Sequence, residues 1–91
     1  MTFMITKSTV EDFDTWKALF DTDPPKARTE ATGYRVYRGA EDPNQVVVQV
    51  EFATPEKAKA ARDKLIASRV LDRLSDVSGP TIVEEAEAIT L

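Results

Sequence analysis

Four residues with chemically useful side chains, Trp16, Phe20, Tyr34 and Arg38, are spaced so that folding could bring them together. Trp16 and Phe20 are four residues apart and would share one face of a helix. Tyr34 and Arg38 are four apart on an alternating segment and would share one face of a strand. Such a site would have stacking aromatic walls, a phenol that donates a hydrogen bond and a guanidinium that stabilises an enolate or phenolate. Phe52, on the same face of a neighbouring predicted strand, would complete the lining.

These residues also have a simpler interpretation. Phe13, Trp16 and Phe20 recur at spacings of three and four, and aromatic stripes of this kind more often fill a core than bind a ligand. Arg38 is near the end of its predicted strand, where an arginine is more often solvated or paired with a carboxylate than catalytic. The residues alone leave both interpretations open.

The composition excludes several classes of site. The chain contains no cysteine and no histidine, which removes disulfides, thiolate or imidazole metal sites, histidine-ligated haem and serine-histidine triads. We therefore expect no metal and no organic cofactor. With 16 acidic and 12 basic side chains, the formal charge is −4, which disfavours binding to nucleic-acid phosphates and to anionic membrane surfaces.

Length and composition predict one globular domain spanning residues 1–91. The chain is 42% hydrophobic and 31% charged, as is usual for a soluble domain. The N-terminus lacks the basic and long apolar regions of a signal peptide, and no apolar run approaches the length of a membrane span. We expect a cytoplasmic protein.

The first half of the chain predicts a strand followed by helices. Residues 3–7 read as a strand whose inward side chains are Phe3 and Ile5. Asp12 is expected to cap the aromatic helix, and the prolines at 24–25 are expected to end it. Residues 26–31 predict a short further helix that ends at Gly33, taken to adopt positive φ.

The middle of the chain predicts an antiparallel hairpin. Its strands are residues 34–38 and the strictly alternating run 45–52, joined by a short turn-rich segment. This connection would place Val36 opposite Val48, and Tyr37 opposite Val47.

The second helix has a strong start, because Thr54 can cap it and Pro55 occupies its first turn. Its inward stripe is narrow and made mostly of small residues, Ala58, Ala61, Leu65 and Ile66, so this helix can lie close to its sheet. A further amphipathic turn runs through Val70, Leu71, Leu74 and Val77. A break at residues 78–80 then precedes a predicted last strand, 81–91.

The resulting order, βαββαβ, predicts a ferredoxin-like α+β fold with a four-stranded antiparallel sheet and both helices on one face. The other face is half polar, and we expect a second copy of the chain to cover it. The predicted dimer interface contains Arg35, Tyr37, Val47, Gln49 and Glu51. An RNA-recognition module would need stacking aromatics and a basic residue on the third strand, which this strand lacks.

Four segments, 12–21, 33–38, 42–48 and 51–52, resemble small members of the dimeric α+β barrel superfamily, the group that includes the antibiotic-biosynthesis-monooxygenase-like proteins. The resemblance implies a homodimer with its sheets face to face and a substrate held between helices and sheet. It also implies a range of activities, including cofactor-independent oxygenases of aromatic polyketide-like substrates, cyclases and haem-degrading enzymes. The missing histidine puts haem degradation in doubt, and the prolines at 24–25 depart from the expected uninterrupted first helix.

Two functions remain as hypotheses. One is a cofactor-independent monooxygenase or cyclase that acts on a planar aromatic molecule, with Trp16, Phe20, Tyr34, Arg38 and Phe52 as the ligand-binding residues. The other is a non-catalytic dimeric module that binds a small apolar ligand or serves a structural role. No catalytic residue can be assigned from the sequence.

Overall fold

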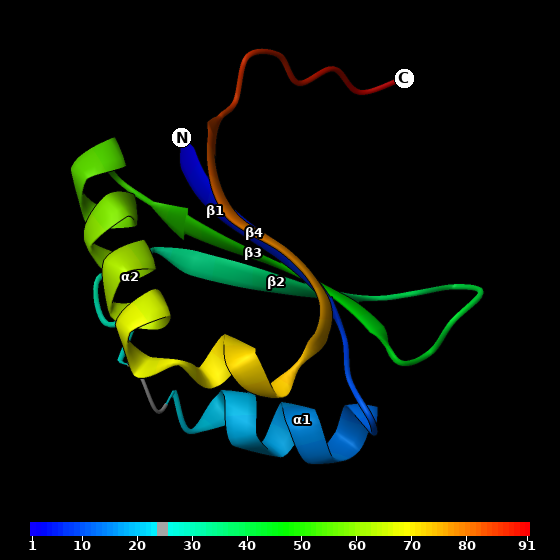
Figure 1. The fold of residues 1–91 in the computed structure, drawn as a ribbon. Coiled ribbons are helices and arrows are strands. Elements are labelled where there is room, and N and C mark those ends of the chain that lie inside the picture. The colour runs from blue at the N-terminus through cyan, green and yellow to red at the C-terminus, as the bar shows by residue number, and fades with distance from the viewer. Residues whose placement is uncertain (24–25) are drawn as a thin grey trace.

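The computed structural model describes residues 1–23 and 26–91 (Figure 1). The elements are β1 (Thr2–Thr9), α1 (Phe13–Asp21), β2 (Gly33–Arg38), β3 (Gln45–Phe52), α2 (Pro55–Ser68), the short 3₁₀ helix η1 (Val70–Arg73) and β4 (Ser75–Glu84). The strands form one antiparallel sheet in the order β2-β3-β1-β4. This arrangement confirms the predicted ferredoxin-like α+β fold. In the described part of the chain, no helix is long and apolar enough to cross a membrane.

The β2–β3 hairpin has the predicted register. Val36 lies opposite Val48, and Tyr37 lies opposite Val47. On β3, Val46, Val50 and Phe52 are buried beneath the helices. The alternation of this strand, with valines and phenylalanine at every second position, therefore sets the helix face of the sheet, as the sequence predicted.

The prediction for β1 had its two faces reversed. Met4 and Thr6 pair with Val50 and Val48 of β3 and are buried on the helix face, whereas Phe3 and Ile5 lie on the opposite face. Because side chains alternate along a strand, the more apolar set of β1 residues points away from the helices. The helix face of β1 instead carries the sequence Thr2, Met4, Thr6 and Ser8, all buried.

The segment after residues 24–25 is not the predicted helix. Residues 27–30 form turns, and Gly33 begins β2 without a positive φ. The carboxylate of Asp23 accepts hydrogen bonds from the backbone N–H groups of Ala27 (3.2 Å) and Arg28 (3.2 Å). These contacts satisfy two backbone donors of the turn and hold it against the end of α1. The prolines at 24–25, expected to end α1, lie outside the described residues.

The last strand lies earlier than predicted. β4 spans Ser75–Glu84 and includes the segment 78–80, which was expected to separate two elements. Gly79 has φ +93° and marks a shift in the pairing of β4 with β1 between Ile5 and Lys7. A glycine at such a shift interrupts the ladder without ending the strand. Beyond Glu84 the chain leaves the sheet and runs away from it (Figure 1).

Helix α2 packs directly on the sheet, as predicted. Thr54 Oγ1 accepts from the Lys57 N–H (3.3 Å), and Pro55 occupies the first turn. The two alanines of the predicted stripe are buried, with Ala58 0% and Ala61 5% exposed, and Leu65 is partly buried. The prediction was wrong for Ile66, which is 53% exposed because it lies on the solvent side of the helix. Together with Met4, Val50 and other sheet residues, these alanines form the hydrophobic core. The described core therefore lies mainly beneath α2.

Candidate ligand cavity beneath α1

Helix α1 begins at a charged cap. The carboxylate of Asp12 accepts hydrogen bonds from the Thr15 N–H (2.9 Å) and the Thr15 hydroxyl (2.7 Å). These bonds favour the ionised form and, with a smaller contribution from the positive charge of Arg38, lower the pKa of Asp12 below its ordinary value. The prediction that Asp12 caps this helix is confirmed, and the cap fixes the start of the aromatic stripe.

The aromatic residues of α1 form a ladder that continues onto the sheet. Ring centroids are 5.8 Å apart for Phe13 and Trp16 and 5.0 Å apart for Trp16 and Phe20. Phe20 then meets Tyr34 of β2 edge-on at 5.5 Å. No residue of α1 is buried, and the flanking Leu19 is 43% exposed. The rings therefore form a wall that stands off the sheet, with space between them and the strands.

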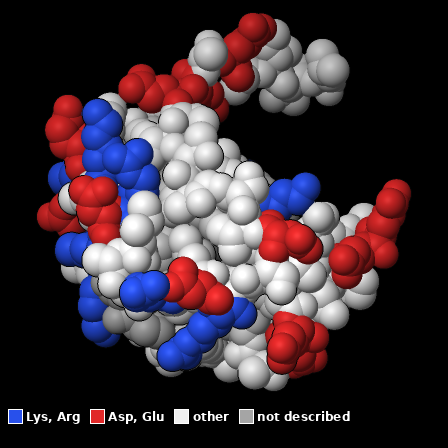
Figure 2. All heavy atoms as spheres, viewed as in Figure 1, with Lys and Arg blue, Asp and Glu red and all other residues white. Residues whose placement is uncertain are grey.

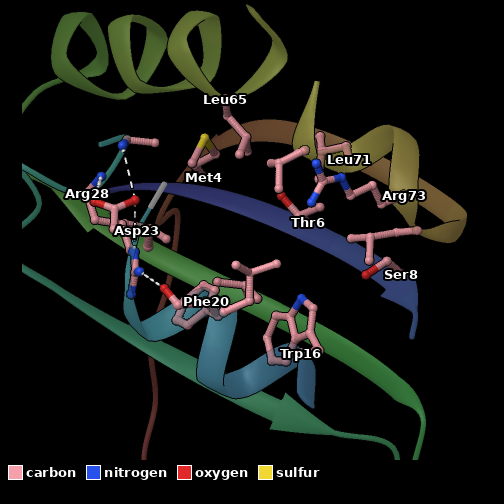
Figure 3. Close-up of a pocket in the computed structure, with 16 residues that line it drawn as sticks. Met4, Thr6, Ser8, Trp16, Phe20, Asp23, Arg28, Leu65, Leu71 and Arg73 are labelled. Atoms are coloured by element: carbon pink, nitrogen blue, oxygen red, sulfur yellow. Dashed lines mark hydrogen bonds and ion pairs between the residues drawn. The ribbon is translucent and has the colours of Figure 1, made fainter. Parts of the chain in front are cut away.

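An arginine from the turn after α1 ties this wall to the rest of the fold. The guanidinium of Arg28 lies 3.8 Å from the Phe20 ring centroid and 4.9 Å from that of Tyr34. It also donates to the Phe20 carbonyl oxygen and pairs with the carboxylate of Asp23 (Nε to Oδ1, 3.5 Å). Both charged side chains are largely buried. Arg28 thus closes one end of the space beneath α1, as Figure 3 shows.

The space is a cavity of about 120 Å³ between α1, the helix face of the sheet, α2 and η1. Its walls are almost entirely apolar. They include Met4, Trp16, Leu19, Phe20, Ala27, Val48, Val50, Leu65, Val70, Leu71 and Leu74, with Thr6, Ser8, Asp23, Arg28 and Arg73 as the polar members. An apolar cavity of ~150 Å³ is large enough to bind benzene, whereas sites for drug-sized ligands are about 300–1,000 Å³. The cavity thus matches a single aromatic ring in size.

The predicted ligand-binding residues are only partly brought together. Trp16 and Phe20 line the cavity, and Tyr34 lies behind Phe20. Arg38 turns away, because its Nε donates to the Pro43 carbonyl (2.7 Å) and its guanidinium lies 4.4 Å from the Phe13 ring. Phe52 is 0% exposed in the core beneath α2 and does not reach the cavity. Whether these residues bind a ligand stays a prediction.

Sequence reasoning missed the polar residues of the cavity. Thr6 and Ser8 were overlooked because the inward face of β1 was assigned to Phe3 and Ile5. The sequence gives little signal for them, since Lys7 lies between Thr6 and Ser8 and Thr9 follows, so this end of the strand is polar on both faces. Arg73 could not be found from the sequence either, because its position depends on how η1 folds back over the sheet.

The predicted dimer-interface residues all lie on the sheet face opposite the helices, which we call the open face. Arg35 pairs with Gln49, and Tyr37 pairs with Val47, in the β2–β3 register. Glu51 lies opposite Phe3 of β1. Phe3, Arg35, Gln49 and Glu51, with Met1, Gly33, Tyr34 and Glu85, line a second, polar hollow of about 380 Å³.

The distribution of charge differs between the helices and the sheet. In Figure 2, acidic and basic side chains gather over α1 and α2, whereas the surface over the strands in the middle of the view is mostly uncharged. The apolar side chains Phe3, Ile5, Val47 and Val83 are at least partly exposed to solvent in the single protomer. Apolar area of this kind on a sheet favours contact with a second surface.

No family model matches the sequence, and no curated protein matches it significantly. Solved structures with the same fold do match. Two are provisionally named antibiotic biosynthesis monooxygenases: one from Nitrosomonas europaea (TM-score 0.70, 17% identity, covering 93% of this chain and 89% of that one) and one from Deinococcus radiodurans (0.67, 14%, 100% and 98%). A third is SnoaB, a cofactor-independent oxygenase from Streptomyces nogalater (0.69, 12%, 97% and 95%). At these identities the likeness shows a shared fold.

Proposed function

We propose that this protein binds a small planar aromatic molecule in the cavity beneath α1. The observation that carries the proposal is the aromatic wall formed by Trp16 and Phe20, which faces an apolar sheet surface across a space the size of one ring. A ring stacked on this wall would gain both hydrophobic burial and favourable ring–ring contacts. Binding there would place the ligand between helix and sheet.

We further propose that the bound molecule is the substrate of a cofactor-independent monooxygenase. Support comes from the shared fold with SnoaB, which is described as an oxygenase of this kind. With a phenol, a ring C–H group and the O–H group would be oxidised to the two carbonyls of a quinone. One atom of O₂ would become the new carbonyl oxygen, the other would leave as water with the two hydrogens, and the substrate would supply all four electrons. The fold likeness is an analogy, so this step needs its own test.

The alternative is a non-catalytic binding module. One observation favours it: the two charged side chains at one end of the cavity, Asp23 and Arg28, form an ion pair with each other. Asp23 also accepts from two backbone N–H groups, which leaves it poorly placed to remove a proton from a ligand. Under this hypothesis the ligand binds and is released unchanged.

Filling the cavity tests ligand binding. Trp16 is the sole tryptophan, so its fluorescence reports directly on the wall of the cavity. We expect phenol-type ligands to alter this fluorescence saturably, and Val48→Phe to weaken binding about tenfold or more, because its ring would occupy the ligand's space. The control, Ile66→Phe, adds the same ring at an exposed position on α2 and should bind normally. Saturable binding that survives Val48→Phe would contradict the proposed location.

Oxygen uptake separates the two functions. A monooxygenase would consume O₂ when mixed with a hydroxylated aromatic ligand and no added cofactor, and Val48→Phe would reduce that rate while Ile66→Phe would not. Ligand binding without any O₂ consumption over a panel of such ligands would support the binding module instead.

We also propose that the protein forms a homodimer through the open face. The partly exposed apolar side chains of β1, β3 and β4 and the complementary charges of Arg35 and Glu51 support this assembly. Analytical ultracentrifugation should find a dimer, and Val47→Glu should dissociate it, because the new charge would be buried in the interface. Ala60→Glu introduces the same charge on exposed α2 and should not. A wild-type monomer at micromolar concentration would refute the proposal. The cytoplasmic location expected from the sequence stays a prediction.

A further inference from the structure

The cavity beneath α1 has a polar end that its apolar walls do not explain. Arg73, at the end of η1, lines the cavity but takes part in no ion pair or side-chain hydrogen bond with any described residue. Arg69, four residues earlier, is by contrast paired with an acidic side chain: its Nε lies 3.0 Å from the Asp72 carboxylate. Arg73 is exposed to solvent, and it brings a positive charge to the edge of the cavity without a protein counter-ion among the described residues.

Two hydroxyl groups line the same cavity as Arg73. Thr6 and Ser8 are 8% and 3% exposed, project from the same face of β1, and both line the cavity. In Figure 3 the Arg73 side chain extends toward Thr6, and the Ser8 hydroxyl lies between Arg73 and Trp16. No described side chain is hydrogen-bonded to either hydroxyl. Among the described residues, every side-chain N or O atom that is fully buried has a hydrogen-bond partner, so these two oxygens are not fully buried. The hydroxyl oxygens therefore open onto the cavity and are free to bind a ligand.

The arrangement matches one kind of chemical group. A guanidinium presents a planar fork of N–H donors that fits a carboxylate, and the two hydroxyls can each donate to a remaining lone pair. The opposite wall, formed by Trp16 and Phe20, fits an aromatic ring. The cavity volume of about 120 Å³ leaves room for one ring rather than several.

We propose that the cavity selects a single-ring aromatic carboxylate, with its ring on the Trp16–Phe20 wall and its carboxylate on Arg73, Thr6 and Ser8. This inference rests on the proposed function and narrows it from planar aromatics in general to monocyclic anions. The whole chain carries a net charge of −4, which repels anions at long range. Because Arg28, the other arginine of the lining, is paired with Asp23, a preference for the anion must come from the local charge of Arg73.

The test compares two ligands of nearly the same shape, benzoate and benzamide, by titrating Trp16 fluorescence. The wild-type protein should bind benzoate about 10- to 100-fold more tightly, the range expected for a charge-assisted hydrogen-bonded contact. Arg73→Met keeps an unbranched apolar stem in place of the arginine but removes the charge, and should abolish the preference. Arg69→Met makes the same change in net charge on an arginine that does not line the cavity, and should retain it.

The hydroxyls provide an independent arm of the test. Thr6→Val and Ser8→Ala should each weaken benzoate several-fold while changing benzamide less, because the neutral amide gains less from a donor. If Arg73→Met fails to fold, Thr6→Val and Ser8→Ala still test the carboxylate subsite. Arg73→Gln is then used as the uncharged variant at position 73.

The possible outcomes distinguish the carboxylate subsite from the more general proposal that the cavity binds an aromatic ring. Equal affinity for the two ligands, or a benzoate preference that persists in Arg73→Met, would overturn the carboxylate subsite and leave aromatic binding intact. Failure of both ligands to perturb Trp16 at millimolar concentration would overturn single-ring binding in this cavity altogether. A preference lost in Arg73→Met and kept in Arg69→Met is the result that supports the inference.

Discussion

Helices α1 and α2 cover the same face of one sheet in opposite ways. α2 presents a stripe of small residues, and Ala58 and Ala61 are buried against the strands. α1 carries the bulkiest side chains of the chain, including Trp16 and Phe20, yet none of its residues is buried. The helix with the smaller side chains therefore contributes more to the core.

The difference follows from side-chain size. Alanine lets the α2 backbone approach the sheet closely, so little space remains between them. Aromatic rings keep the α1 backbone at a distance, and where they stack on one another they do not fill the space beneath. The cavity lies where the two kinds of packing meet, with Leu65 of α2 and Leu71 of η1 forming its far side. One half of the protein is thus closely packed, and the other encloses the cavity.

The largest expected effect is on the α2 side. Ala58→Leu should lower the free energy of unfolding by about 1–3 kcal/mol, because no space exists for the added atoms at a fully buried position. Ala60→Leu, on the exposed side of the same helix, should change it by less than ~0.5 kcal/mol. Urea denaturation measures both. Equal effects of the two substitutions would mean that α2 is not closely packed.

A smaller effect is expected where α1 is tied to the fold. Arg28→Met removes the contacts with Phe20, Tyr34 and Asp23 and should cost about 1–2 kcal/mol. Native-state hydrogen exchange should show that protection is lost mainly in α1, while α2 is unchanged.

The control for Arg28 is Arg62→Met. Arg62 on α2 pairs weakly with Asp63, at 3.8 Å and with both side chains well exposed, so its removal should have little effect on stability. Loss of protection in α2 rather than α1 would contradict the role given to Arg28.

The smallest effect concerns the cap of α1 and depends on pH. The Thr15 hydrogen bonds lower the pKa of Asp12 in the folded state relative to the unfolded chain. The cap therefore contributes its full stabilisation above the unfolded pKa, and this contribution is lost as the pH falls through the folded value. Carbon-detected NMR titration should find the Asp12 pKa below the usual aspartate range, and Thr15→Val should raise it. An Asp12 pKa unaffected by Thr15→Val would show that the hydrogen bonds are not its cause.

The sequence was most informative where local signals agree with the packing. The Thr54–Pro55 helix start, the alanines of the α2 stripe and the alternation of β3 each predict one structure, and each is found, although Ile66 of the predicted stripe is exposed. β1 failed because its more apolar residues, Phe3 and Ile5, face away from the helices. A rule that places apolar residues beneath helices fails on a sheet with apolar side chains on both faces.

The candidate site was harder to predict because it depends on tertiary contacts. Trp16 and Phe20 could be placed from helical spacing. The arginine that contacts Phe20 and Tyr34, however, is Arg28 rather than Arg38, because the turn after α1 folds back onto the aromatic ladder. Arg73 likewise reaches the cavity through the path of η1. Neither position has a local sequence signature.

The most direct test of the account is to find where an aromatic ligand binds. Intermolecular nuclear Overhauser effects should be measured between the ring protons of benzoate and the protein methyl groups. The account predicts contacts with Val48 and Leu65, which line the cavity beneath α1. Contacts confined to Val47 and Val83, on the open face of the sheet, would contradict it.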